Sequence, residues 1–360
     1  MNSKPYEDLT PDAVLDALES IGLRGDGRML GLNSYENRVY QISLEDDSTV
    51  VAKFYRPARW TDAQILEEHA FGLELAEREI PVVAPRVLAG KTLHEFKGYH
   101  FAVYDRRGGR PPELEDEKVL EWIGRFIGRI HAVGAVAPFR ARPVLDAETF
   151  GEEPRDWLLE SGLIPDELRE VWAGVSAEAL DRAQPLLQGA RDIRLHGDCH
   201  VGNILWTDQG PHFVDLDDAR MGPAAQDLWM LLAGDRATAT RQLKALLDGY
   251  ERFHPFNREE LGLIEPLRTL RLIHYAAWIG RRWEDPAFPA AFPWFGTGRY
   301  WQDRILELRE QTAAEPPNQG RICLAMTGWT RNSRNDERKI VAAYGNVASS
   351  GRRATSSVRI

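Results

Sequence analysis

The chain has 360 residues, of which 43% are hydrophobic and 28% charged, as in ordinary globular enzymes large enough to hold two lobes. Its formal net charge of -10 argues against a general nucleic-acid binder, which would need a basic face. Two cysteines, Cys199 and Cys323, are too few for a disulfide framework and suit a reducing compartment.

The chain shows no secretory signal at residues 1–10 and no run near the ~18–20 apolar residues that a membrane helix needs. We therefore expect a cytoplasmic protein without a membrane partner. No feature requires an oligomer, so a monomer is the simplest expectation.

A small β-rich N-lobe is predicted over residues 1–104. Residues 11–21 read as an amphipathic helix with Thr10 as its N-cap and Pro11 at its first position. Two strand-like runs, RVYQISL and TVVAKFY, flank an acidic turn and predict a hairpin. The remaining expected elements are a helix at 62–79, which ends before Pro81, and strands at 86–89 and 99–104.

A hinge is predicted at residues 105–112, where DRRGGRPP is polar and rich in Gly and Pro. The larger, mainly helical C-lobe should follow at 113–320. Its expected elements are a helix at 117–134, two helices within 155–189, strands within 191–216, and helices at 225–251 and 262–283. The fold class is thus α+β, with two lobes.

The last forty residues differ in composition. Residues 321–360 hold eight Lys or Arg against two Asp or Glu and lack clear periodicity. We expect a poorly packed basic tail. The simpler interpretation is an altered C-terminus without function, and the alternative is a basic segment that binds a partner.

The most informative stretch is HGDCHVGN at 196–203, followed by an apolar strand and FVDLDD at 213–218. Phosphoryl transfer needs a carboxylate beside the attacking hydroxyl and oxygen ligands for Mg²⁺. Asp198 and Asn203 stand at the two ends of one short loop, and the following hairpin returns Asp215 beside them. The simpler interpretation, turn-forming residues between strands, explains neither the full spacing nor the upstream partners.

A lysine interrupts the apolar strand VVAKF. Burying an unpaired ammonium is unfavourable, so Lys53 should meet anions, either ATP phosphates or a carboxylate of the next helix. Glu67 and Glu68 are both available there, and we prefer Glu68. The alternative is an edge-strand lysine whose amine reaches solvent.

The loop before this strand, residues 30–39, has one glycine and is no G-x-G-x-x-G motif. Asn33 and Ser34 could still offer backbone N–H groups and a hydroxyl to phosphate. An ordinary hairpin turn explains the loop equally well.

These stretches together resemble a known group. SYENRVYQ (34–41), VAKFYRP (51–57), ILEEHAFGLEL (65–75), HGDCHVGNILW (196–206) and FVDLDDARMGPAAQDLWMLL (213–232) are similar to the YihE/RdoA family of bacterial stress response kinases. That family lies in the aminoglycoside/choline kinase branch of the protein-kinase-like superfamily. The resemblance covers roughly residues 5–315 and implies a two-lobed protein-kinase-like fold.

The resemblance also implies residue roles. Asp198 would be the catalytic base, and Asp215 would likewise be essential for catalysis. Asn203 and Asp215 would bind Mg²⁺, while Lys53 and Glu68 would form the pair that positions the ATP phosphates.

Three further roles follow from the same resemblance. Ser34 would touch ATP in the phosphate loop, and Tyr104 would line the adenine pocket. Asp227 would brace the catalytic loop from the helix that follows it.

The leading functional hypothesis is an ATP- and Mg²⁺-dependent serine/threonine protein kinase that acts on protein hydroxyls in a stress response. The alternatives are a kinase for a choline-, homoserine- or aminoglycoside-like alcohol and a pseudokinase that only binds ATP. A two-metal phosphoesterase built from His196, Asp198, His200, Asp215 and Asp217 would leave Lys53 unexplained.

Two smaller features carry competing interpretations. Cys199, next to Asp198, could be redox-active, although a small buried side chain is the simpler expectation. Residues 275–301 are dense in aromatics, which could form a box for a quaternary ammonium group or, more simply, a helical core or a wall of the acceptor groove.

Overall fold

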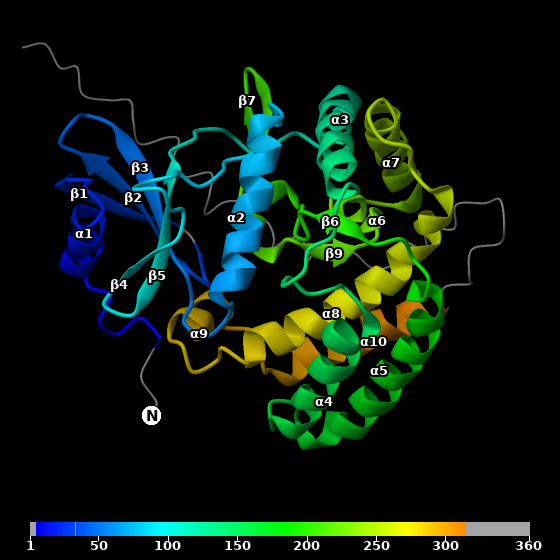
Figure 1. Ribbon diagram of the computed structural model, residues 1–360. Helices are drawn as coiled ribbons and strands as arrows, with labels where there is room; N and C mark the ends of the chain where they lie inside the picture. The colour runs from blue at the N-terminus through cyan, green and yellow to red at the C-terminus, as the bar shows by residue number, and fades with distance from the viewer. Residues whose placement is uncertain (1–4, 33, 314–360) are drawn as a thin grey trace, which may run out of the picture.

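The computed structural model describes residues 5–32 and 34–313. A sheet at one side of the molecule is followed by a mainly helical region, with helix α2 between them (Figure 1). This arrangement confirms the α+β, two-lobed fold class. The basic tail expected at 321–360 lies outside the described residues.

The N-lobe is an antiparallel sheet of order β1-β2-β3-β5-β4. Its strands are β1 (Gly25–Leu32), β2 (Arg38–Leu44), β3 (Thr49–Phe54), β4 (His94–Phe96) and β5 (Tyr99–Asp105). The helix α1 (Pro11–Glu19) begins at the predicted N-cap, where the Thr10 side chain accepts the Ala13 N–H.

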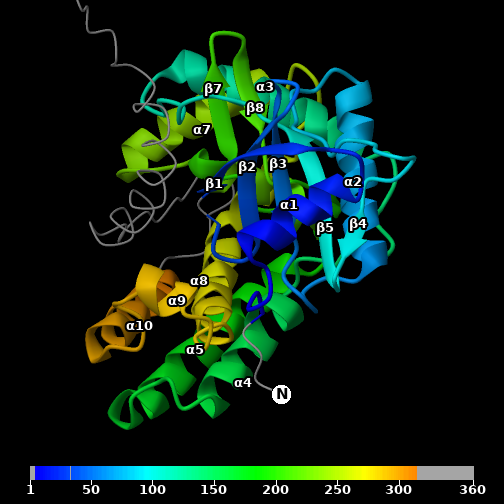
Figure 2. The ribbon, with the colours of Figure 1, turned by 90° about the vertical axis from the view of Figure 1, so that its left-hand side faces the viewer.

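Helix α1 covers one face of this sheet, as Figure 2 shows. Its buried Val14 and Leu18 share a core with Ala52 and Phe54 of β3. Successive strand residues point to opposite faces, so Lys53 points away from α1, toward α2 and the C-lobe. Strand alternation therefore sets the direction of the lysine.

Helix α2 (Asp62–Glu77) joins the two lobes. It begins with a capping box between Thr61 and Gln64. Its Phe71 and Leu75 belong to the C-lobe core, while Ile65 packs with Ala102 of β5 and with Tyr55, which directly follows β3.

The C-lobe is built from helices and two small two-stranded sheets. The helices are α3 (Glu117–Gly134), α4 (Glu153–Glu160), α5 (Asp166–Leu187), α6 (Ala225–Trp229), α7 (Arg236–Tyr250), α8 (Ile264–Gly280), α9 (Ala287–Ala291) and α10 (Gly298–Ala313), with a π-helical turn at Glu148–Glu152 and 3-10 turns at Val201–Asn203, Leu216–Asp218 and Arg258–Leu263. The strands pair as β6 (Ile193–Leu195) with β9 (Arg220–Gly222) and as β7 (Ile204–Thr207) with β8 (Gly210–Phe213).

Two predicted elements differ in the structure. The strand expected at 86–89 is wrong, because only isolated bridges occur there and the chain reverses at Ala89 and Gly90, both with positive φ. The helix expected at 225–251 is two helices: α6 ends at Trp229, and after Gly234, which has a φ of 91°, α7 begins with Asp235 as its N-cap. Within the described residues no helix combines the length and apolar character needed to cross a bilayer.

Candidate active site

A cavity of about 180 Å³ lies where the two lobes meet. Its lining includes Ser34, Asp198, Asn203 and Asp215, which the sequence assigned to the site. Lys53, Glu68 and Tyr104 lie outside this lining. Ser34 lies far before the other three residues in the sequence, so the fold brings it to them.

Asp198 follows β6 on a loop whose backbone is held by Asp227 of α6. The buried carboxylate of Asp227 accepts the backbone N–H groups of His196 and Gly197 at 2.8 and 2.9 Å and lies 3.0 Å from Nε2 of His131. Gly197 has a φ of 84°, and a Cβ there would meet the Asp218 carbonyl oxygen at 2.1 Å, so only glycine fits. The contacts of Asp227 match the bracing role expected for it.

Asn203 and Asp215 stand on either side of the β7–β8 hairpin. Asn203 donates from Nδ2 to the Asp198 carbonyl at 3.0 Å, which leaves Oδ1 as its remaining polar atom. Asp215 has a left-handed backbone, with φ 60° and ψ 65°, and its side chain is 47% exposed. A non-glycine residue in this conformation is uncommon and is typical of constrained functional loops.

The carboxylate of Asp198 lies between two basic side chains. Oδ1 is 3.0 Å from Nη1 of Arg271 on α8, and Oδ2 is 3.4 Å from Nε2 of His200. Burial raises the pKa of Asp198, but the Arg271 and His200 charges outweigh it and hold that pKa well below the usual range. Asp198 is therefore ionised and able to accept a hydrogen bond from a hydroxyl.

Lys53 makes ion pairs with the loop that follows β8. Its Nζ lies 2.8 Å from Oδ1 of Asp215 and 3.1 Å from Oδ1 of Asp217. Burial disfavours the charged lysine, yet the two carboxylates raise the pKa of Lys53 well above its ordinary value. The interpretation as a solvent-directed edge lysine is wrong, because the side chain is 8% exposed.

Glu68 is buried near Lys53 but is not its ion-pair partner. Among residues 5–32 and 34–313, the carboxylates within 4.0 Å of Lys53 are those of Asp215 and Asp217. Glu68 Oε2 is buried without a hydrogen bond, while neighbouring Glu67 accepts the backbone N–H groups of residues 140–142. Glu67 is thus committed to the C-lobe, and Glu68 is the glutamate that faces inward.

Replacing Glu68 with Gln is expected to stabilise the protein at alkaline pH. Burial raises the pKa of Glu68 from 4.5 to about 7, so stability is lost as pH rises through that interval. Glutamine avoids this loss, and the gain at pH 8 should be about 2–3 kcal/mol and vanish near pH 4. Thermal unfolding at both pH values measures it.

Glu67→Gln is the matched control for this prediction. Although partial burial raises its pKa, the backbone N–H groups of residues 140–142 lower the pKa of Glu67 overall, so its charge contributes stability at neutral pH that the substitution removes. The two neighbouring variants should shift the melting temperature in opposite directions at pH 8. Equal shifts, or a Glu68→Gln effect independent of pH, would contradict the assignment.

Tyr104 lies at the end of β5, next to the hinge. Its hydroxyl is 3.0 Å from that of Tyr55, which in turn is 2.7 Å from Nε2 of His69. This buried chain of polar groups holds the hydroxyl of Tyr104 between the sheet and α2. The expected adenine contact of Tyr104 stays a prediction.

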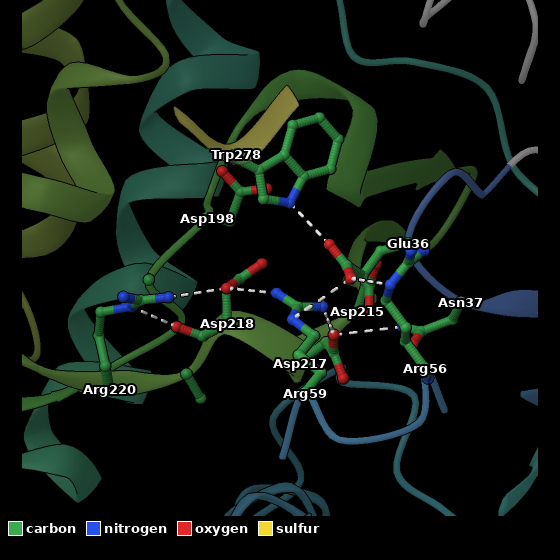
Figure 3. Close-up of polar contacts among 12 residues, drawn as sticks. Glu36, Asn37, Arg56, Arg59, Asp198, Asp215, Asp217, Asp218, Arg220 and Trp278 are labelled. Atoms are coloured by element: carbon green, nitrogen blue, oxygen red, sulfur yellow. Dashed lines mark hydrogen bonds and ion pairs between the residues drawn. The ribbon is translucent and has the colours of Figure 1, made fainter. Parts of the chain in front are cut away.

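A network of charged and polar groups connects the loop between β1 and β2 to the C-lobe (Figure 3). Glu36 accepts the indole N–H of Trp278 at 2.7 Å and lies 3.6 Å from Nε of Arg56. Asn37 donates to Asp217 at 3.2 Å, and Arg59 pairs with Asp217 and, at 2.9 Å, with Asp218. These contacts hold the hairpin loop between β1 and β2 against the C-lobe, and its phosphate contact stays a prediction.

The two-metal phosphoesterase alternative finds no support. Within the described ranges, no three His, Cys, Asp or Glu side chains gather in a group that could hold a metal ion. His196 instead lies 3.0 Å, through Nε2, from the Val214 carbonyl and packs against Phe213.

Cys199 is a buried residue of the C-lobe core. Burial and the nearby Asp227 and Asp198 charges raise the pKa of its thiol well above the ordinary value, which disfavours the reactive thiolate. The simpler expectation, a small buried side chain, describes its position.

The aromatic segment 275–301 divides between core and cavity. Phe288, Phe295, Tyr300 and Trp301 are buried in the core, whereas Tyr275, Trp278 and Phe292 line the cavity. Both parts of the simpler expectation, core and groove wall, are therefore seen.

Sequence reasoning missed three residues of this site: Asp217, Arg59 and Arg271. Asp217 was visible in FVDLDD but entered only the hydrolase alternative. Arg271 interrupts an apolar helix, which was a usable signal, whereas Arg59 lies in a polar loop that offered none.

Comparisons with known proteins agree with this geometry. Residues 30–264 match the phosphotransferase enzyme family. Stress response kinase A of Escherichia coli K12 is 47% identical over 319 residues, which cover 87% of this chain and 96% of that protein. The serine/threonine protein kinase RdoA of Salmonella typhimurium is 46% identical over 328 residues, covering 88% and 98%.

Among solved structures, the amicoumacin kinase hAmiN in complex with AMP-PNP, Ca²⁺ and Ami is similar in fold. Its TM-score is 0.65 at 18% identity, with 84% of this chain and 94% of that chain covered. These matches confirm the resemblance to stress response kinases and the protein-kinase-like fold that the sequence predicted.

Proposed function

This chain belongs to the phosphotransferase enzyme family, and on that premise we propose that it is an ATP- and Mg²⁺-dependent serine/threonine protein kinase. The observation that carries the proposal is that Asp198, Asn203 and Asp215 line one cavity. Lys53, which lies outside the lining, forms an ion pair with Asp215. The presence of all four of these residues also counts against a pseudokinase.

The residues present suit a magnesium ion. Asn203 Oδ1 and the Asp215 carboxylate are the hard oxygen ligands that Mg²⁺ takes from proteins, with phosphates and water completing its shell. A positive group, the Lys53 amine, already lies against Asp215 Oδ1 in the structure. When bound, Mg²⁺ would neutralise charge on the transferring phosphate.

The side chains divide the work of phosphoryl transfer. Asp198 orients the acceptor hydroxyl and accepts its proton as the hydroxyl oxygen bonds to the γ-phosphorus and the bond to ADP breaks. Lys53 holds the α- and β-phosphates, and Ser34 offers its hydroxyl to the phosphates. Glu68 would be the ion-pair partner of Lys53 when Asp215 binds metal. Asp227 keeps the Asp198 loop in place.

A protein acceptor is proposed from the Salmonella relative, whose name describes a serine/threonine protein kinase at 46% identity. The stress-response role is proposed on the names of the same relatives. The low cysteine content supports action in the cytoplasm.

Transfer of labelled phosphate tests the acceptor. With γ-labelled ATP and Mg²⁺, we expect the chain to label casein on Ser or Thr, and chelation with EDTA or Asp198→Ala to abolish the label. Turnover of choline, homoserine or kanamycin without protein labelling would overturn the protein-kinase proposal. Nucleotide binding without any transfer would indicate a pseudokinase.

A further inference from the structure

The loop at residues 215–219 carries the proposed metal ligand Asp215 in an unfavourable backbone conformation. Asp215 has φ 60° and ψ 65°, and the 3-10 turn at Leu216–Asp218 follows it directly. A residue with a Cβ keeps a left-handed conformation only where surrounding contacts hold it. The contacts that fix the backbone of this loop therefore decide where the Asp215 carboxylate lies.

Arg142 donates hydrogen bonds to two carbonyl groups of this loop. Its Nε donates to the Ala219 carbonyl at 2.7 Å, and its Nη2 donates to the Asp217 carbonyl. Arg142 is only 4% exposed, and its guanidinium lies over the Trp60 ring, 4.1 Å from the ring centroid. Because a guanidinium is a rigid planar fork, it fixes the directions of both carbonyl groups at once.

The contacts of Arg142 differ from those of other arginines beside this loop. Arg59 and Arg220 both pair with the Asp218 carboxylate, at 2.9 and 2.7 Å. Arg142 instead directs its hydrogen bonds to backbone carbonyls. Its burial lowers the pKa of Arg142, although the Asp217 charge opposes this effect. Arg142 therefore acts on the course of the backbone, whereas Arg59 and Arg220 act on the charge of the loop.

The segment that carries Arg142 is bound to α2. The Glu67 carboxylate accepts the backbone N–H groups of residues 140–142 at 2.5, 2.8 and 2.8 Å. Gln64 donates from Nε2 to the Ala141 carbonyl at 3.1 Å. Arg142 thus connects α2 on one side with the loop at 215–219 on the other.

We propose that Arg142 is a positioning residue for metal binding, which sets the Asp215 carboxylate by fixing the backbone of residues 215–219. Glu67 holds Arg142 in place in turn. The inference rests on the proposed Mg²⁺-dependent function, and Arg142 acts from outside the cavity lining. Residues that orient a metal ligand from behind typically contribute about 10–100-fold to metal affinity.

Calorimetric binding of AMP-PNP, with Mg²⁺ or with EDTA, tests the proposal without turnover. The wild type should bind the nucleotide more tightly with Mg²⁺. Arg142→Gln should need about 10–100-fold more Mg²⁺ for the same gain, while its affinity in EDTA stays that of the wild type. Arg142→Lys keeps the charge without the fork, so its Mg²⁺ requirement should fall between the two. The lysine variant also keeps the test open if Arg142→Gln does not fold.

Kinetics give a second readout. Raising the Mg²⁺ concentration should return kcat of the Arg142 variants toward the wild-type value, because bound metal restores the position of Asp215. A kcat that stays low at every Mg²⁺ concentration, together with an unchanged Mg²⁺ affinity, would overturn the positioning role.

Arg194→Gln is the matched control. Arg194 is also buried, donates to the Val133 carbonyl at 2.9 Å and pairs with Glu74 of α2 at 2.8 Å. Its removal should lower the melting temperature but leave the Mg²⁺ requirement unchanged when measured at a temperature where the variant is folded. Equal Mg²⁺ shifts in the Arg142 and Arg194 variants would indicate general destabilisation and contradict the proposal.

A double-mutant cycle tests the route through α2. Glu67→Gln should raise the Mg²⁺ requirement by a smaller factor than Arg142→Gln, and it should add little in the Arg142→Gln background. Independent, multiplying effects would show that Glu67 does not act through Arg142.

The wild-type titration separates this inference from the function on which it rests. If Mg²⁺ does not change the affinity of the wild type for AMP-PNP, the proposed Mg²⁺-dependent function is wrong and the inference falls with it. If the wild type responds to Mg²⁺ and the Arg142 variants respond equally, only the role of Arg142 is wrong.

Discussion

Asp198→Ala is expected to lower kcat by about 10²–10⁴-fold while ATP affinity changes little, because the variant loses proton acceptance and hydroxyl orientation but not the phosphate contacts. Asp198 lines the cavity and has a basic neighbour at each of its carboxylate oxygens. Steady-state kinetics measure the first quantity, and equilibrium binding of ATP measures the second.

Asp248→Ala controls for this substitution. Asp248 forms an exposed ion pair with Lys244 on α7, so its removal should leave both kcat and ATP affinity unchanged. If Asp198→Ala loses ATP binding and turnover together, the carboxylate belongs to the nucleotide site and its role as base is wrong. If turnover persists, another group accepts the proton.

Asp227→Ala should reduce the free energy of unfolding by about 3–5 kcal/mol, because it removes a buried carboxylate and leaves its buried hydrogen-bond partners unsatisfied. The substitution leaves the N–H groups of His196 and Gly197 and the ring of His131 without their acceptor. The loop that holds Asp198 should loosen, so kcat should fall even at temperatures where the variant is folded. Urea unfolding and kinetics at low temperature measure the two effects.

The pH dependence of stability distinguishes the effect of the Asp227 charge from the effect of side-chain packing. Burial raises the pKa of Asp227, but the His131 contacts and the His196 N–H hold it below the ordinary 3.8. Its stabilisation is therefore present above the unfolded-state pKa and is lost as pH falls through the folded-state value. The difference in the free energy of unfolding between the wild type and Asp227→Asn should become smaller in acid. A difference that does not depend on pH would indicate an effect of packing alone.

Local sequence signals located the helices with strong caps and clear periodicity. The helix at 117–134 has the predicted bounds, and Thr10 caps α1 as expected. Predictions failed where tertiary contacts or turns interrupt a pattern, as at residues 86–89 and at Gly234. Helices α9 and α10 were not predicted.

The sequence by itself determined that Asp198, Asn203 and Asp215 belong together, since the loop and hairpin between them are short and their spacing is local. It could not determine the partners of Lys53, because Asp215 and Asp217 lie more than 160 residues away and the nearby Glu68 was preferred. Nor could it place Arg271 beside Asp198. Those contacts depend on how α8 and the two lobes pack, and burial, rather than sequence spacing, decides which charges meet.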